Sequence, residues 1–256
     1  MGARFRIADA VVSRWRQPNY YAIDIQKDRR GEFFEFRVVP HLRDAIDVTL
    51  LQAQPRERHL LLVVKRKGAI EKDRFLCGHD ERAWFVAAVP GTASTISQAQ
   101  EALKPKEVAT AQTITRVPTR KKNLRKNEAF RRQGEWFFVP APKLVVNLRF
   151  ILRKEPIRRG AGKAHILEEA YRSGGERVYV HAKYPNGVLE KDYERILAQK
   201  NTVRSSWRIM VRNAAVYARG TVRHPDHKTI KLQGWHRVLM NTETQTRAME
   251  NLAFLD

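Results

Sequence analysis

The stretch YYAIDIQKDRRGEFFEFRVV, residues 20–39, decides the fold class of this chain. Two runs rich in aromatic and branched residues, 20–25 and 33–39, flank the polar turn KDRRGE. In the second run, apolar residues at positions 34, 36 and 38 alternate with charged residues, which is typical of a strand with one buried face. The stretch therefore predicts an antiparallel β-hairpin.

The same signals continue through the first half of the chain. Polar turns join two further pairs of predicted strands, residues 45–53 with 59–65 and residues 75–77 with 83–89. A helix is expected after Thr95, because Gln98 stands at the capping-box distance, and Pro105 ends it.

The second half is also predicted to be mostly β. Its expected strands are residues 135–139, 178–181, 215–222, 229–232 and 235–240, and its expected helices are 164–172 and 189–199. The fold class is therefore α+β, predominantly antiparallel β with a few short helices, in two compact units. We expect domains at 1–110 (antiparallel β plus helix) and 134–256 (mostly β with two helices), joined by a basic linker or helix at 111–133.

Net charge indicates the partner. The chain has 256 residues with 49 Lys and Arg against 27 Asp and Glu, a net charge of +22. Such an excess attracts polyanions and favours counterion release on binding, so nucleic acid is the expected partner. A hydrophobic fraction of 43% is enough for packed cores, which argues against a disordered basic tail.

Cysteine content and hydropathy argue against several other classes of protein. Cys77 is the only cysteine, which excludes an internal disulfide and a Cys-rich zinc finger and fits a reducing compartment. No apolar run approaches the roughly 20 residues of a membrane span, and the N-terminus lacks the apolar core of a secretory signal. We expect a cytoplasmic protein with no membrane partner, no cofactor and no bound metal.

Positive charge is densest at residues 116–132, interpreted as a phosphate-contacting arm or, alternatively, a solvated linker. A second basic stretch, RRGAGK at 158–163, can contact phosphate through its backbone or form a plain flexible turn. It is not a Walker A loop, because Ala164 follows the lysine. The predicted nucleic-acid contacts are Arg120, Lys121, Lys122, Arg125, Lys126, Arg158, Arg159, Lys163, Arg223 and Arg237.

Histidines are the candidates for chemistry. The turn RHPDH at 223–227 carries His224 and His227, with His236 in the next strand and His165 available in space. Two histidines near a lysine can act as general base and acid in RNA cleavage. Alternatively, His224, Asp226, His227 and His236 offer metal ligands of the right type, or the turn is only structural.

A further candidate is Cys77, which lies near His79 in the stretch CGHDER at 77–82. A cysteine beside a histidine can be a nucleophile. The alternative is a hairpin turn with no chemistry.

Three stretches of the second half carry a resemblance: RQGEWFFVP at 132–140, GKAH at 162–165, and RHPDHKTIKLQGWHRV at 223–238. They resemble a class of uncharacterised bacterial and phage-borne proteins that have an RQG(D/E)-type strand start and a late HxxH turn. The resemblance implies one compact, mostly β unit for the second half and carries no activity.

Together these features predict a nucleic-acid-binding protein. RNA is preferred, because no helix-turn-helix or zinc finger is recognisable and strand-rich basic surfaces suit folded or single-stranded RNA. One alternative is a ribonuclease that uses His165, His224, His227 or His236. Another is a structural subunit of a larger ribonucleoprotein.

Overall fold

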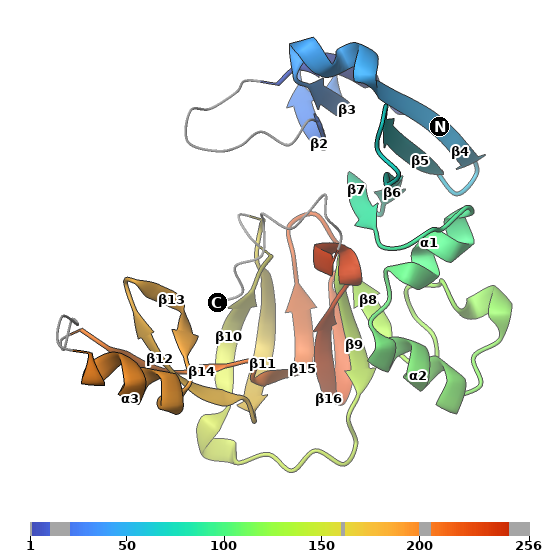
Figure 1. Ribbon diagram of the computed structural model, residues 1–256. Coiled ribbons are helices and arrows are strands. Elements are labelled where there is room, and N and C mark those ends of the chain that lie inside the picture. Colours follow the sequence, from blue (N-terminus) through green and yellow to red (C-terminus); the bar gives the residue numbers. More distant parts are fainter. Residues whose placement is uncertain (1, 11–20, 160–161, 200–205, 246–256) are drawn as a thin grey trace.

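The structure is a computed structural model that describes residues 2–10, 21–159, 162–199 and 206–245. These residues form four β-sheets, mostly antiparallel, with short helices between them (Figure 1). The predicted α+β class is therefore confirmed. None of the described helices is long and apolar enough to cross a membrane.

The first half contains two sheets. The first has the order β1–β3–β2, with β1 at Phe5–Asp9, β2 at Tyr21–Asp28 and β3 at Gly31–Val38. The second is an antiparallel meander of β4 at Ile46–Gln54, β5 at His59–Arg66, β6 at Lys72–Asp80 and β7 at Ala83–Val89. All three predicted hairpins are confirmed, whereas the parallel pairing of β1 with β3 was not foreseen.

The meander is covered on both faces. On one face, Phe34 of β3 packs in a buried cluster with Phe75 and Cys77 of β6. On the other face, Leu61 and Leu76 pack against the helix α1 at Ile96–Ala102. Burial of apolar side chains on both faces is what holds this half together.

The predicted capping box of α1 is confirmed. The Thr95 hydroxyl accepts a hydrogen bond from the Gln98 amide, and the Gln98 side chain accepts one from the Thr95 amide, both at 3.2 Å. A second helix, α2 at Lys106–Ile114, follows Pro105 and was not predicted. The expected domain limit at residue 110 therefore falls inside α2.

A six-stranded sheet forms the centre of the second half. Its order is β10–β11–β15–β16–β9–β8, with β8 at Arg131–Gln133, β9 at Trp136–Pro140, β10 at Leu152–Ile157, β11 at His165–Ser173, β15 at Ala215–Arg223 and β16 at Ile230–Met240. Phe138, Leu167 and Val222 are fully buried in its core. Val108 of α2 packs beside Phe137 of β9 in a further buried cluster.

A small lobe lies beside this sheet (Figure 1). It has the strand order β13–β12–β14, with β12 at Glu176–His181, β13 at Tyr184–Val188, β14 at Arg208–Arg212 and the helix α3 at Glu190–Ala198. Tyr193 of α3 stacks on Tyr179 of β12 at a centroid distance of 3.9 Å. The predicted helix at 189–199 is thus confirmed. Among the described residues, the short 3₁₀ segments are Pro40–Ala45, Thr119–Lys121, Leu148–Phe150 and Thr242–Gln245.

The helix predicted at 164–172 is wrong, because this segment is the strand β11. Its residues Leu-Glu-Glu-Ala have good helix propensity, but β10 and β15 pair with it on both sides. Burial also alternates, with His165 and Leu167 inside and Ile166 outside. Pairing with the two neighbouring strands has outweighed the helix propensity of this segment.

Two other expectations need correction. The segment 111–133, expected as a basic linker or helix, is helical only up to Ile114 of α2, and residues 119–133 are a single 3₁₀ turn, a loop and the strand β8. Asn127 stabilises the loop, since its side-chain oxygen accepts hydrogen bonds from the amides of Ala129 and Phe130. The separate strands at 229–232 and 235–240 are one continuous strand, β16.

Candidate functional site

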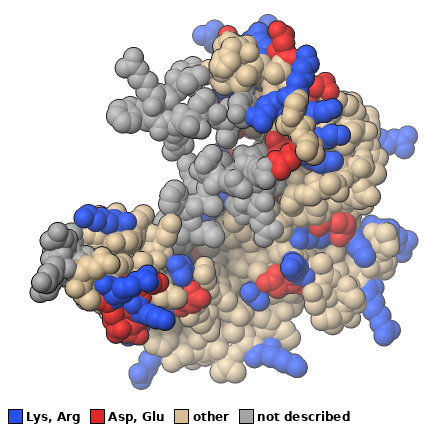
Figure 2. All heavy atoms as spheres, in the orientation of Figure 1, with Lys and Arg blue, Asp and Glu red and all other residues tan. Residues whose placement is uncertain are grey.

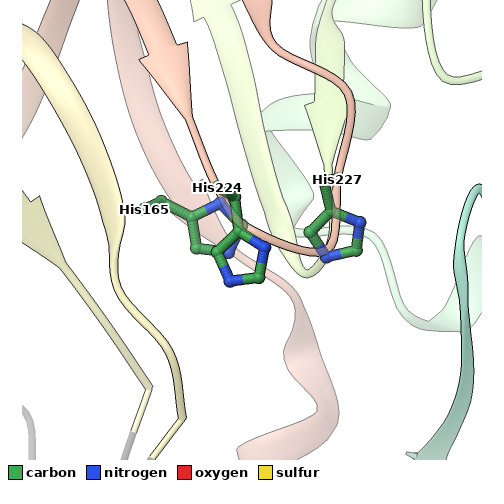
Figure 3. A group of neighbouring side chains, drawn as sticks. All are labelled: His165, His224 and His227. Atoms are coloured by element: carbon green, nitrogen blue, oxygen red, sulfur yellow. The ribbon is translucent and has the colours of Figure 1, made fainter.

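Three of the four candidate histidines gather at one end of the six-stranded sheet (Figure 3). His165 begins β11, and His224 and His227 lie in the loop between β15 and β16. One ring nitrogen from each lies within 4.8 Å of the others, and the His165 and His224 rings stack at 4.1 Å. His236 is not part of the group, because it lies further along β16 with Nδ1 at 3.0 Å from the Gly234 carbonyl.

Gln133 fixes the tautomer of His165. The Gln133 side-chain amide donates to the carbonyls of Val222 (3.2 Å) and Lys228 (2.7 Å), so its oxygen faces His165 Nδ1 at 2.9 Å. Nδ1 must therefore carry the proton in the neutral ring. This leaves the Nε2 lone pair of a fully buried histidine free to accept a proton or bind a metal.

Gly134 makes room for the imidazoles. It has φ of +57°, and a Cβ there would lie 2.8 Å from His227 Nε2 and 3.2 Å from His165 Cε1. Gly134 and Glu135 form the two-residue turn between β8 and β9, since Gln133 pairs with Trp136. Glycine is thus required both by the backbone angle and by the close approach of the rings.

Carboxylates flank the cluster. Glu135 Oε2 lies 3.6 Å from His165 Nε2, and Glu81 Oε2 lies 3.7 Å from His227 Nδ1. Burial opposes the charge on Glu135, but its contact with the protonated form of His165, together with the charge of Arg159, keeps the pKa of this carboxyl below the usual value. When the ring is neutral, the Nε2 lone pair faces this carboxylate at 3.6 Å and does not stabilise it. Asp226 pairs with Lys163 at 2.8 Å, which lowers the pKa of that carboxyl.

The rings of His224 and His227 favour the neutral form. Burial lowers the pKa of His224 and of His227 below the ordinary histidine value, and the nearby imidazole of His165 lowers both further. Neutral imidazoles are the form that accepts protons and binds metals.

A cavity of about 270 Å³ adjoins the cluster and lies between the two halves of the chain. The first half contributes His59 and Trp84 to its wall, and the second half contributes Arg159, Glu135 and His227. Among the described residues, three buried nitrogens of this wall have no hydrogen-bond partner: His59 Nδ1, Arg159 Nη2 and His227 Nδ1. Both halves of the chain therefore present unpaired polar nitrogens to the cavity.

Sequence reasoning missed Gln133, Gly134, Glu135 and Glu81 as members of this site. The first three lie in the RQGE stretch that carried the resemblance, but nothing local links that stretch to histidines more than 30 residues away. Glu81 lies in the CGHDER turn, where attention fell on Cys77. Cys77 is buried in β6, and burial raises the pKa of its thiol to about 12, which is unfit for a nucleophile.

The predicted nucleic-acid contacts divide into two groups. Five pair with acidic side chains: Lys121 with Glu128, Arg125 with Asp80 and Glu81, Arg159 with Glu243, Lys163 with Asp226, and Arg237 with Glu107. The other five have no ion pair within the described part of the chain: Arg120, Lys122, Lys126, Arg158 and Arg223. Figure 2 shows Lys and Arg spread over the visible face, with no single dense patch. Gly160 and Ala161 of the RRGAGK stretch lie outside the described residues.

Comparisons of the chain with family models, with curated proteins and with solved structures gave no match. The site must therefore be interpreted from its own geometry.

Proposed function

We propose that the protein binds nucleic acid, RNA in preference to DNA, through basic side chains of both halves. The observation that carries this proposal is the charge imbalance. Even if each of the 27 acidic residues neutralised one basic residue, 22 of the 49 Lys and Arg would remain for phosphates. The single, buried cysteine further supports a cytoplasmic location.

RNA is favoured because the described helices suit major-groove reading poorly. α1, α2 and α3 have nine residues or fewer and pack against sheets. Duplex-reading motifs instead present a helix that enters the groove. Single-stranded or folded RNA is bound by strand-rich surfaces with accessible cations.

Binding is tested by the fluorescence anisotropy of a labelled single-stranded RNA and a labelled duplex DNA over a series of salt concentrations. We expect log K to fall linearly with log[salt] and RNA to bind more tightly. A protein that binds neither at low salt overturns the proposal.

A charge-matched pair of variants locates the surface. Replacement of Arg120, Lys122 and Lys126 by Gln removes three cations that have no described ion pair. The control replaces Lys65, Lys67 and Lys72 by Gln, because these residues are exposed and are not among the predicted nucleic-acid contacts. We expect the first variant to reduce the salt slope by about 2 and the control to leave it unchanged. An equal reduction of the slope in both variants would show that nucleic-acid binding depends only on the total charge of the protein.

The second candidate function is RNA cleavage at the histidine cluster, and the convergence of His165, His224 and His227 favours it. In such a reaction the 2′-oxygen forms a bond to phosphorus while the bond from phosphorus to the 5′-oxygen breaks. One imidazole takes the 2′-hydroxyl proton and another donates a proton to the leaving 5′-oxygen. His165 Nε2, held as an acceptor by Gln133, is the candidate base.

Cleavage is tested with labelled RNA and with the same strand carrying 2′-deoxyribose, each with and without a chelator. We expect wild type to cleave only RNA, and His227→Asn to be inactive. His41→Asn, which alters an exposed histidine remote from the cluster, is the control. If the wild-type protein does not cleave RNA even when divalent metal ions are added, the cleavage function is excluded. The proposal of RNA binding is unaffected by that result.

A further inference from the structure

We propose that His165, His224 and His227 bind a divalent transition metal ion, with Zn²⁺ as the best fit, and leave one coordination position for water or substrate. Neutral imidazole suits zinc, copper, iron and nickel better than magnesium or calcium. Three protein ligands with an open fourth position are typical of catalytic zinc sites. This inference does not rest on nucleic-acid binding.

The spacing of the rings is close to that of a metal site. With Zn–N bonds of about 2.0–2.1 Å, tetrahedral geometry places ligand nitrogens about 3.3 Å apart. The three ring nitrogens here lie within 4.8 Å of one another. Rotation of the side chains about their own bonds closes this gap, because His224 and His227 lie in a loop and are only partly buried.

The surroundings supply what a metal-binding histidine needs. The Gln133 side-chain oxygen accepts a hydrogen bond from His165 Nδ1–H at 2.9 Å. The lone pair of the neutral ring is therefore on Nε2, which is the atom that can bind the metal. Gly134 keeps the space beside His227 Nε2 clear of a side chain. Both are positioning residues, since neither offers a ligand atom in this group.

Charge also favours a cation at this place. Glu135 lies 3.6 Å from His165 Nε2, and Glu81 lies 3.7 Å from His227 Nδ1. The negative charge of Glu135 partly compensates a dication, which three neutral imidazoles alone would not do, whereas the charge of Glu81 is shared with Arg125. Lys163, which contacts the loop, is neutralised there by Asp226. The adjoining cavity, which His227 and Glu135 line, offers room for water or substrate.

Metal binding is tested by equilibrium dialysis of the full-length protein against ZnCl₂ with elemental analysis, and by titration with CoCl₂ followed in the visible absorption spectrum. We expect one equivalent of Zn²⁺ and the absorption of tetrahedral cobalt. Absence of stoichiometric binding of either ion overturns the proposal.

Two variants remove a ligand with little risk to folding. In the structure the Asp226 amide donates to His224 Nδ1 at 3.1 Å, so the neutral ring carries its proton on Nε2 and must release this bond or change tautomer when it binds the metal. His224→Asn retains an acceptor for that amide. His227→Asn removes the second loop ligand. Because loss of a supporting residue alone typically costs 10–100-fold in metal affinity, loss of a ligand should cost more than about 100-fold.

The controls separate this inference from the others. His41→Asn should bind the metal as wild type does, and thermal unfolding should show that each variant is folded. If His224→Asn and His227→Asn both bind the metal with the affinity of the wild type, the metal is bound elsewhere and the proposal is overturned. RNA affinity measured on the same preparations reports separately on nucleic-acid binding.

Discussion

At the scale of single residues, Gln133 connects His165 to the histidine loop by hydrogen bonds. It is buried, and its amide joins His165 to the loop carbonyl of Lys228. Gln133→Leu leaves His165 Nδ1–H and that carbonyl without partners in a buried place. We expect a loss of about 2 kcal/mol in the free energy of unfolding, measured by urea denaturation. Gln233→Leu on the exposed side of β16 is the control and should change stability little.

Cys77 gives a second test at this scale. Because burial raises its thiol pKa to about 12, the thiolate fraction at pH 8 is only about 10⁻⁴. We expect no reaction with a thiol reagent such as DTNB in the native protein and one equivalent of reaction after denaturation. Rapid, stoichiometric modification of the native protein would contradict the structure at this position.

At the scale of elements, β11 is a strand where the sequence predicted a helix. Leu167 is fully buried, whereas the adjacent Ile166 is 37% exposed. Leu167→Ala should cost about 2–5 kcal/mol of unfolding free energy and Ile166→Ala much less, measured by chemical denaturation. Similar losses at the two positions would contradict the alternation of a strand.

The strands could be predicted where their own sequence alternates. Residues 33–39 carry that signal locally, and the structure places β3 there. Residues 59–65 are instead a short, continuous run of leucine and valine bounded by polar residues, and the structure places β5 there. The segment 165–173 carries a helical signal instead, and only its two neighbouring strands make it extended. The parallel pairing of β1 with β3 depends on contacts between distant segments, so no local pattern indicates it.

The candidate site was predictable only in part for the same reason. Histidine is rare and conspicuous, so His165, His224 and His227 could be named. Gln133 and Glu81 are common polar residues, and their roles arise from contacts with segments far along the chain. The Lys228 amide donates to Glu81 across 147 positions. No spacing rule connects such residues.

At the scale of the whole molecule, Glu243 joins the two halves. Its buried carboxylate accepts a hydrogen bond from the Ala88 amide of β7 and pairs with Arg159. Glu243→Gln keeps an acceptor for Ala88 but leaves the guanidinium without its countercharge. We expect a loss of about 3 kcal/mol in the free energy of unfolding.

The control for this prediction is an exposed ion pair. Glu176→Gln breaks the pair with Arg212 on the small lobe, where both side chains are more than one-third exposed. It should cost less than about 1 kcal/mol. If the two variants lose the same stability, Glu243 has no special role between the halves.

The cavity between the halves has a thermodynamic consequence. A molecule bound there touches both walls, so its binding energy adds to the free energy that holds the halves together. By mass action, a ligand at 100 times its dissociation constant adds about 2.7 kcal/mol to the stability of the assembled state. The linkage is reciprocal, so Glu243→Gln should also lower the binding affinity of any ligand that contacts both walls of the cavity. Occupancy of the cavity and the stability of the contact between the two halves are therefore thermodynamically linked.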